Sequence, residues 1–167
     1  MPRLVLIRHA KSSWTTGLDD PQRPLSNRGR RDAAALGELL RDRKIIPELL
    51  WCSDAVRARE TWDRARDAGA RAQQVELRPE LYGASAAQVQ ALAKSASRKV
   101  RTLMMIGHHD GIPGCLSQLA RRDGDEETWA SIDRKYPTAA CAVLECSSWA
   151  DLAPGTAHLL WYQVPRG

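Results

Sequence analysis

The sequence predicts an α/β fold: a three-layer α/β/α sandwich with a mostly parallel central sheet, formed as a single domain by residues 1–167. Short apolar runs of strand length alternate with longer segments of helical periodicity, which is typical of a sheet covered by helices on both faces. A chain of 167 residues buries about two-thirds of its unfolded surface, so we expect it to fold without a disulfide or a structural metal.

The first predicted strand is the apolar run Leu4–Ile7, which is too short for a helix. Arg8 and His9 follow directly at its carboxyl end. A charged side chain there must leave the core or meet an anion, and ligands of open α/β sheets bind outside the carboxyl ends of the strands. The pair is therefore a candidate phosphate or carboxylate site. By itself it also fits a strand-end histidine beside a surface arginine.

Two later apolar runs end in a similar way. The run 101–107 is followed by His108, and the run 49–52 is followed closely by Arg57. Three strands that each deliver histidine or arginine to one edge of a sheet are difficult to explain by packing, so the recurrence favours a functional site.

A polar loop, residues 10–24, joins the first strand to the first helix and contains two prolines and a glycine. Loops of this length in compact domains are usually functional or disordered. Because the loop begins at Arg8 and His9, we expect Ser12, Ser13 and Arg23 to reach back into the site and bind substrate.

The remaining elements follow from capping residues and periodicity. Ser26 is predicted to cap a helix that runs to about residue 43, and Ser53 or Asp54 is predicted to cap the next one, at about 55–68. Arg57 lies in the first turn of that helix, where a cation opposes the helix dipole, a cost that a bound anion would reverse. The later elements are expected to be a strand at 74–77, a helix at 85–94, a strand at 100–106, a helix from the 107–114 loop to about 121, a polar insertion with a short helix at 122–136, and strands at 139–146 and 158–163.

The net charge of +5 does not indicate nucleic-acid binding. Only five of the 25 basic residues are lysines, and the arginines alternate with acids as on solvated helix faces. No apolar stretch approaches the roughly 20 residues that cross a bilayer, and no hydrophobic run of signal-peptide length opens the chain. We therefore expect a cytoplasmic protein with neither a nucleic-acid nor a membrane partner.

No cofactor or metal is expected. The four cysteines lack metal-ligand spacing. Cys141 and Cys146 are five positions apart in a predicted strand, which puts them on opposite faces of the sheet. Packing in the core is the better explanation for them.

Together the candidate residues suit phosphoryl transfer. The guanidinium groups of Arg8, Arg23 and Arg57 match phosphoryl oxygens through charge-assisted hydrogen bonds. Their charge favours a neutral His9, which could attack phosphorus and form a phosphohistidine that water then cleaves. His108 would donate to a non-bridging oxygen. The arginines would neutralise charge as magnesium does elsewhere, so the reaction needs no metal.

Four segments carry a family resemblance, namely Leu6–Ala10, Arg23–Gly29, Cys52–Thr61 and Ile106–His108. In this order they resemble the motifs of the histidine phosphatase superfamily, whose fold is phosphoglycerate-mutase-like. The short chain and its Arg-Pro-Leu-Ser motif look like the small bacterial phosphohistidine phosphatases of that superfamily. The resemblance covers nearly the whole chain.

The resemblance implies a phosphatase that hydrolyses phosphohistidine on a phosphoprotein, with His9 as the phosphorylated nucleophile. It implies that Arg8, Arg57 and His108 complete the phosphate pocket, that Arg23 joins them in the short members, and that a phosphate ion would bind there. The alternatives on the same scaffold are a phosphatase of small phosphate esters and a catalytically weak module that binds phosphate or a phosphoprotein.

The chain departs from the family pattern near the proton donor. Ala10 replaces the usual glycine after the nucleophile, and His109-Asp110 stands where relatives often carry Asn-Pro. Larger members protonate the leaving group with a carboxylic acid. Glu80 lies in the comparable region and is our candidate, against a structural or N-cap role, and Asp110 is a weaker one. A phosphohistidine substrate needs less help, because its leaving nitrogen is easily protonated.

Two other chemistries are less favoured. Cys115 and Arg121 have the spacing of a cysteine phosphatase, but the residues between them are helical in pattern and contain no glycine. A metal hydrolase would use the histidines with Asp110, yet the adjacent His108 and His109 would point apart. The histidine phosphatase interpretation requires two imidazoles that face each other across the arginines, with no acidic residue of the protein filling the space between them.

Overall fold

A six-stranded sheet runs through the middle of the protein, and the computed structural model describes all residues from 1 to 167. The strands are β1 (Arg3–Arg8), β2 (Leu49–Cys52), β3 (Gln74–Leu77), β4 (Thr102–Gly107), β5 (Cys141–Glu145) and β6 (His158–Gln163). Their order is β3-β2-β4-β1-β5-β6. The first four strands are parallel, and β5 and β6 extend the sheet in antiparallel fashion. The predicted, mostly parallel sheet is confirmed.

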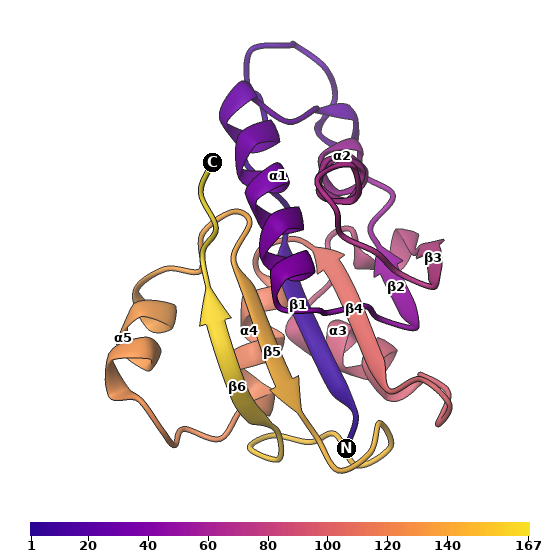
Figure 1. Ribbon diagram of the computed structural model, residues 1–167, viewed down its shortest axis with the longest axis vertical. Coiled ribbons are helices and arrows are strands. Elements are labelled where there is room, and N and C mark those ends of the chain that lie inside the picture. Colours follow the sequence, from indigo (N-terminus) through magenta and orange to yellow (C-terminus); the bar gives the residue numbers. More distant parts are fainter.

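Helices cover both faces of the sheet (Figure 1). They are α1 (Asn27–Asp42), α2 (Val56–Asp67), α3 (Ala86–Lys94), α4 (Gly111–Leu119) and α5 (Glu126–Arg134), with short 3₁₀ helices η1 (Asp20–Gln22) and η2 (Pro79–Leu81). On one face, Leu36 of α1 and Trp62 of α2 share a buried cluster with Val5 of β1. On the other, Leu116 of α4 packs in a cluster with Leu4. Successive residues of a strand point to opposite faces, so β1 feeds both layers and the three-layer sandwich is confirmed.

The predicted helices and strands all form, and their caps explain where two of the helices begin. The Ser26 hydroxyl accepts the Gly29 N–H at 3.1 Å at the start of α1, and Ser85 forms a capping box at the start of α3. The prediction that Ser53 or Asp54 caps α2 is wrong. The cap position is Ala55, which offers no side-chain acceptor. Ser53 lies two residues before it, and its hydroxyl contacts the Ala55 N–H and His108.

The arrangement of the strands brings the predicted site together. In the parallel ladders Arg8 of β1 pairs with Gly107 of β4, and Cys52 of β2 pairs with Ile106 of β4. The residues that follow these three strands therefore emerge side by side at the carboxyl edge of the sheet.

The cysteines are accounted for by the core. All four are buried and unpaired, and Cys141 and Cys146 lie in hydrophobic clusters on opposite faces of the sheet, as predicted. None of the helices combines the length and apolar character that a membrane-spanning segment requires.

The contact between α1 and α2 gives a test of the packing. A Cβ atom at Gly37 of α1 would collide with the backbone carbonyl of Ala65 in α2. We expect Gly37→Ala to lower the free energy of unfolding by about 1–3 kcal/mol, the usual cost of overpacking. Urea denaturation measures it. The exposed neighbour Glu38, replaced by Ala, is the control and should change stability by no more than about 0.5 kcal/mol. Equal effects of the two substitutions would contradict the tight helix contact.

Candidate active site

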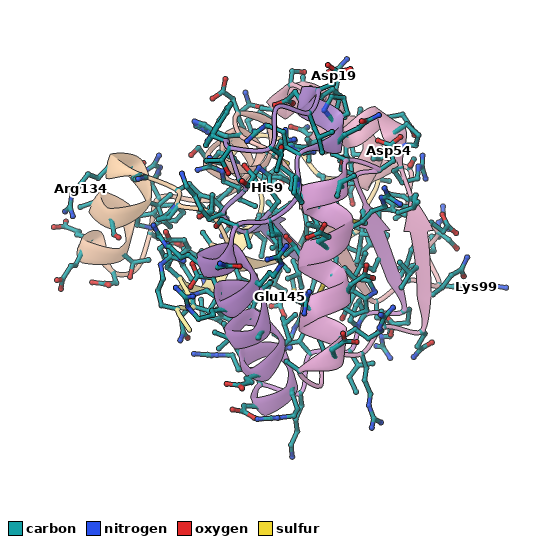
Figure 2. All side chains as sticks on the ribbon, turned by 90° about the horizontal axis from the view of Figure 1, so that it is seen from above. His9, Asp19, Asp54, Lys99, Arg134 and Glu145 are labelled. Atoms are coloured by element: carbon teal, nitrogen blue, oxygen red, sulfur yellow. The ribbon has the colours of Figure 1, made fainter.

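Two histidines face each other at the carboxyl edge of the sheet. His9 follows β1 and His108 follows β4, and their ring centroids are 5.1 Å apart. Both are buried, with 7% and 8% of their surfaces exposed. The His9 N–H donates to the Gly107 carbonyl at 3.0 Å, which ties the two strand ends together. Figure 2 places His9 near the centre of the molecule, with Lys99 and Arg134 on opposite sides.

The hydrogen bonds of His9 define which ring nitrogen is free to react. Its Nδ1 lies 2.7 Å from the Ala10 carbonyl oxygen, which can only accept, so Nδ1 carries the proton. Arg57 Nε–H points to His9 Nε2 at 3.4 Å. Nε2 therefore presents a lone pair toward the arginine side of the site.

Burial and nearby cations keep both imidazoles neutral. Burial lowers the pKa of His9 to about 3, and the charges of His108, Arg57 and Arg8 add to this against a backbone hydrogen bond to Ala10. Burial likewise lowers the pKa of His108 to about 4, with Arg57 contributing and Asp20 opposing. Both rings are thus uncharged at neutral pH, which is the form in which a histidine can act as a nucleophile.

Two arginines border the histidine pair. Arg57 comes from the first turn of α2 and is buried. Arg8 is the last residue of β1, and its Nη1 donates to the Tyr136 carbonyl at 2.9 Å. Arg8 makes no ion pair with an acidic residue, whereas Arg57 does, with Asp20.

Asp20 corrects the expectation that no acidic residue of the protein occupies the space between the arginines. Its carboxylate contacts Arg57 Nη2 at 2.9 Å and Arg23 Nε at 3.1 Å, and its backbone carbonyl accepts from Arg57 Nη1 at 2.6 Å. The Tyr82 hydroxyl donates to the same carboxylate at 2.6 Å. These hydrogen bonds, with that of Tyr82 the largest contribution, hold the pKa of Asp20 below its usual range. A fixed negative charge therefore lies against two of the three arginines.

The Asp20 side chain lies at the mouth of the site and not inside it. The side chain is 46% exposed, whereas the Arg57 side chain that it meets is 7% exposed. Ion pairs open to water contribute little to stability. A phosphoryl group could therefore compete for Arg57, provided that Asp20 moves or shares it.

The 10–24 loop folds back on the site, and Arg23 is held within it. Arg23 Nη1 donates to the Ser12 hydroxyl at 2.8 Å and to the Ser13 carbonyl at 3.1 Å. Its guanidinium also stacks on the Trp14 ring, 3.5 Å from the centroid. Asp20 connects Arg23 to Arg57. Ser12 and Ser13 thus contact Arg23 and position it.

Glu80 lies in η2 and faces Arg78, which binds its carboxylate through Nε at 3.0 Å and Nη2 at 2.8 Å. The hydrogen bond from Arg78 lowers the pKa of this exposed carboxyl group. The Asp110 side chain is 92% exposed and contacts His109 Nε2 at 2.8 Å. The structure brings neither carboxylate into contact with His9 or His108.

Two residues of the site were not predicted from the sequence. Asp20 bridges the arginines, and Tyr82 meets His108 edge to face with centroids 5.4 Å apart. Tyr82 lies two positions after Glu80, so the predicted segment does reach the site, through Tyr82. An acidic residue in a loop gives no sequence signal that it will fold back on an arginine.

The two rival chemistries lack a matching arrangement. No group of three or more His, Cys, Asp or Glu side chains is placed to hold a metal ion. Cys115 is fully buried in α4, and burial raises the pKa of its thiol to about 12. It therefore lacks the thiolate form that a cysteine nucleophile needs.

Comparisons with known proteins agree with this geometry. Residues 4–110 match the model of the histidine phosphatase superfamily (branch 1). An uncharacterized protein of Mycobacterium tuberculosis is 36% identical over 96% of this chain and 100% of its own length. The structure of a candidate phosphohistidine phosphatase SixA from Nakamurella multipartitia superimposes with a TM-score of 0.83 at 31% identity, covering 98% of this chain and 96% of that one. A second, from Agrobacterium tumefaciens, gives 0.79 at 26% identity over 98% and 99%.

The neutral imidazoles give a test by titration. In the unfolded protein a histidine has a pKa near 6.5, whereas in the folded protein the pKa is about 3 for His9 and about 4 for His108. At a pH between these values and 6.5, the unfolded state binds more protons than the folded state. The two residues therefore make folding stability decrease as the pH falls below about 6.5. Imidazole ¹⁵N NMR, assigned with a His9→Ala variant, should report both rings as neutral from pH 8 to pH 5. Midpoints near 6.5 would contradict the buried, cation-flanked environment.

Proposed function

The chain belongs to branch 1 of the histidine phosphatase superfamily, and within that family we propose that it hydrolyses phosphohistidine on a phosphoprotein through a covalent intermediate on His9. The observation that carries this proposal is the pair of buried, neutral imidazoles 5.1 Å apart beside Arg57. The two structures above, which are candidate phosphohistidine phosphatases at 31% and 26% identity, support this substrate class. Residues 1–167 would form one catalytic domain.

In the first step, Nε2 of His9 attacks phosphorus. The new Nε2–P bond forms as the P–N bond of the substrate breaks, and the leaving imidazole takes a proton. In the second step, water attacks the phosphohistidine, so that orthophosphate leaves and His9 is restored. The bond from His9 Nδ1 to the Ala10 carbonyl orients the ring and stabilises the positive charge that it carries as the phosphohistidine forms.

The guanidinium groups would bind the non-bridging oxygens. Arg8 borders the histidines without an acidic partner, and Arg57 approaches Nε2 of His9 to 3.4 Å. Forked, charge-assisted hydrogen bonds suit a phosphoryl group, and they supply the charge neutralisation that magnesium gives in other phosphoryl-transfer enzymes. The proposed reaction is therefore independent of metal. Arg23 would contribute from the loop, held by Ser12 and Ser13.

Protonation of the leaving group depends on the substrate. A leaving imidazole is basic and can take its proton from solvent. For an ester this task would fall to Glu80, whose carboxylate would first have to leave Arg78 and take up a proton. The proposed chemistry thus favours phosphoramidates over esters.

Space beside the site supports a protein substrate over a small ester. An open cleft of about 560 Å³ adjoins Arg8 and is bordered by Arg134 and Lys135 near the end of α5. It is much larger than a phosphoryl group, and it could hold the residues that flank a phosphorylated histidine. A small ester, or a module that binds phosphate without turnover, would make little use of it.

We expect His9→Ala to abolish release of phosphate from a phosphohistidine-containing protein, a loss on the order of 10³-fold or more because the nucleophile is gone. Folding should persist, since His9 belongs to none of the hydrophobic core clusters. Phosphate release from the phosphoprotein is compared with release from a panel of small phosphate esters, with and without a chelator.

The exposed histidine His158, replaced by Ala, is the matched control and should keep full activity. Retained activity in His9→Ala would exclude the covalent mechanism. Faster turnover of esters than of the phosphoprotein would favour the small-ester alternative. Loss of activity in the presence of chelator would exclude a metal-independent reaction. If the wild type showed no turnover, the module that binds phosphate or a phosphoprotein would be the remaining alternative.

Competition between Asp20 and the phosphoryl group gives a second prediction. Asp20→Asn removes the charge that Arg57 now meets, so inorganic phosphate should bind about two- to fivefold more tightly, the equivalent of a solvent-exposed ion pair. Isothermal titration calorimetry measures the affinity. Asp19→Asn changes a neighbouring exposed charge and should have little effect. Weaker binding in Asp20→Asn would mean instead that Asp20 holds Arg57 in its binding position.

A further inference from the structure

His108 makes one side-chain hydrogen bond within the protein, and its partner is a buried serine. His108 Nε2 lies 2.8 Å from the Ser53 hydroxyl. Ser53 is 0% exposed and directly follows β2, and its N–H donates to the Ile106 carbonyl of β4 at 3.0 Å. The serine is therefore fixed by the sheet next to the histidine.

The other contact of Ser53 determines which way the shared proton points. The Ala55 N–H donates to the Ser53 oxygen at 3.2 Å at the start of α2. The hydroxyl proton then still needs an acceptor, and His108 Nε2 is the acceptor in reach. A neutral imidazole has one donor and one acceptor nitrogen. If Nε2 accepts, the ring proton is on Nδ1.

The opposite arrangement leaves more buried groups without partners. If His108 Nε2–H donated to Ser53, the serine proton would have no acceptor in a fully buried position, and Nδ1 would carry a bare lone pair. Buried polar groups without partners are costly. His108 Nδ1 is buried and has no hydrogen-bond partner in the protein, so in the favoured tautomer it is a free donor.

We propose that Ser53 is a positioning residue that holds His108 in its Nδ1–H tautomer, and that this N–H donates to a phosphoryl oxygen during transfer. The second half rests on the proposed function, whereas the first does not. The two histidines then share one tautomer but face the site with different nitrogens. His9 presents the lone pair of Nε2, and His108 presents the N–H of Nδ1.

The tautomer can be read directly in the intact protein. Long-range ¹H–¹⁵N NMR at pH 7.5 distinguishes protonated from unprotonated ring nitrogens, and His108 should have its proton on Nδ1. In Ser53→Ala the Nε2–H form should become populated. Ser12→Ala is the matched control, because Ser12 is a buried serine of the same site that bonds Arg23 and not His108, and it should leave the His108 tautomer unchanged.

Kinetics then connect the tautomer to the reaction. The kcat of Ser53→Ala should fall at least about tenfold, since loss of one preorganised donor costs on the order of 10²–10³ and a fraction of His108 keeps the useful tautomer. The change in KM should be smaller, because the donor matters most as charge develops on the phosphoryl oxygens. Ser53→Thr keeps the hydroxyl and should restore both the tautomer and most of the kcat.

The outcomes separate this inference from the proposed function. An Nε2–H tautomer in the wild type, or an unchanged tautomer in Ser53→Ala, overturns the role of Ser53 whatever the activity. The expected tautomers in a protein without phosphatase activity would support the positioning role and reject the proposed function. If Ser53→Ala does not fold, the wild-type and Ser53→Thr spectra still decide the assignment.

Discussion

The parallel register between β1 and β4 is the constraint on which the site depends. Arg8 pairs with Gly107, so the next residue of each strand is a histidine, and the two rings meet. A shift of one residue in either strand would turn every side chain of that strand to the other face of the sheet. The register is maintained because Leu4 and Leu6 fill one core and Val5 and Ile7 fill the other. Core packing on both faces thus positions the two imidazoles.

Electrostatics at this edge require compensation. Arg57 and Arg23 approach the site with full positive charges, and neutral histidines do not offset them. Asp20 supplies the missing negative charge from the 10–24 loop, through contacts with both arginines. Because the carboxylate is half exposed, water screens its interaction, and the same contacts that stabilise the resting protein can be exchanged for those of an anion. In the resting protein, the Asp20 carboxylate therefore occupies contacts of Arg57 and Arg23 that the proposed phosphoryl group would take over.

The ends of the strands also fix which nitrogen of each imidazole carries the proton. One hydrogen-bond partner next to each strand end sets the tautomer of each ring: the Ala10 carbonyl accepts from His9 Nδ1, and the Ser53 hydroxyl donates to His108 Nε2. Both partners are at the carboxyl edge, one from the same strand and one from the neighbouring strand. This explains why Ser53 does not cap α2, as its position before the helix suggested.

Local residue patterns were enough to predict the α/β sandwich, the helices and strands within about two residues, and the segments that meet at the site. These properties depend on periodicity and on strand ends, which neighbouring residues set. The contacts across the site could be found only in the folded structure. Asp20 and Tyr82 come from segments that are far apart in the chain, and the Glu80 carboxylate turns to Arg78, two residues before it, and not to the histidines. Such contacts arise from side-chain directions and from long-range electrostatic pairing, which no local pattern of residues records.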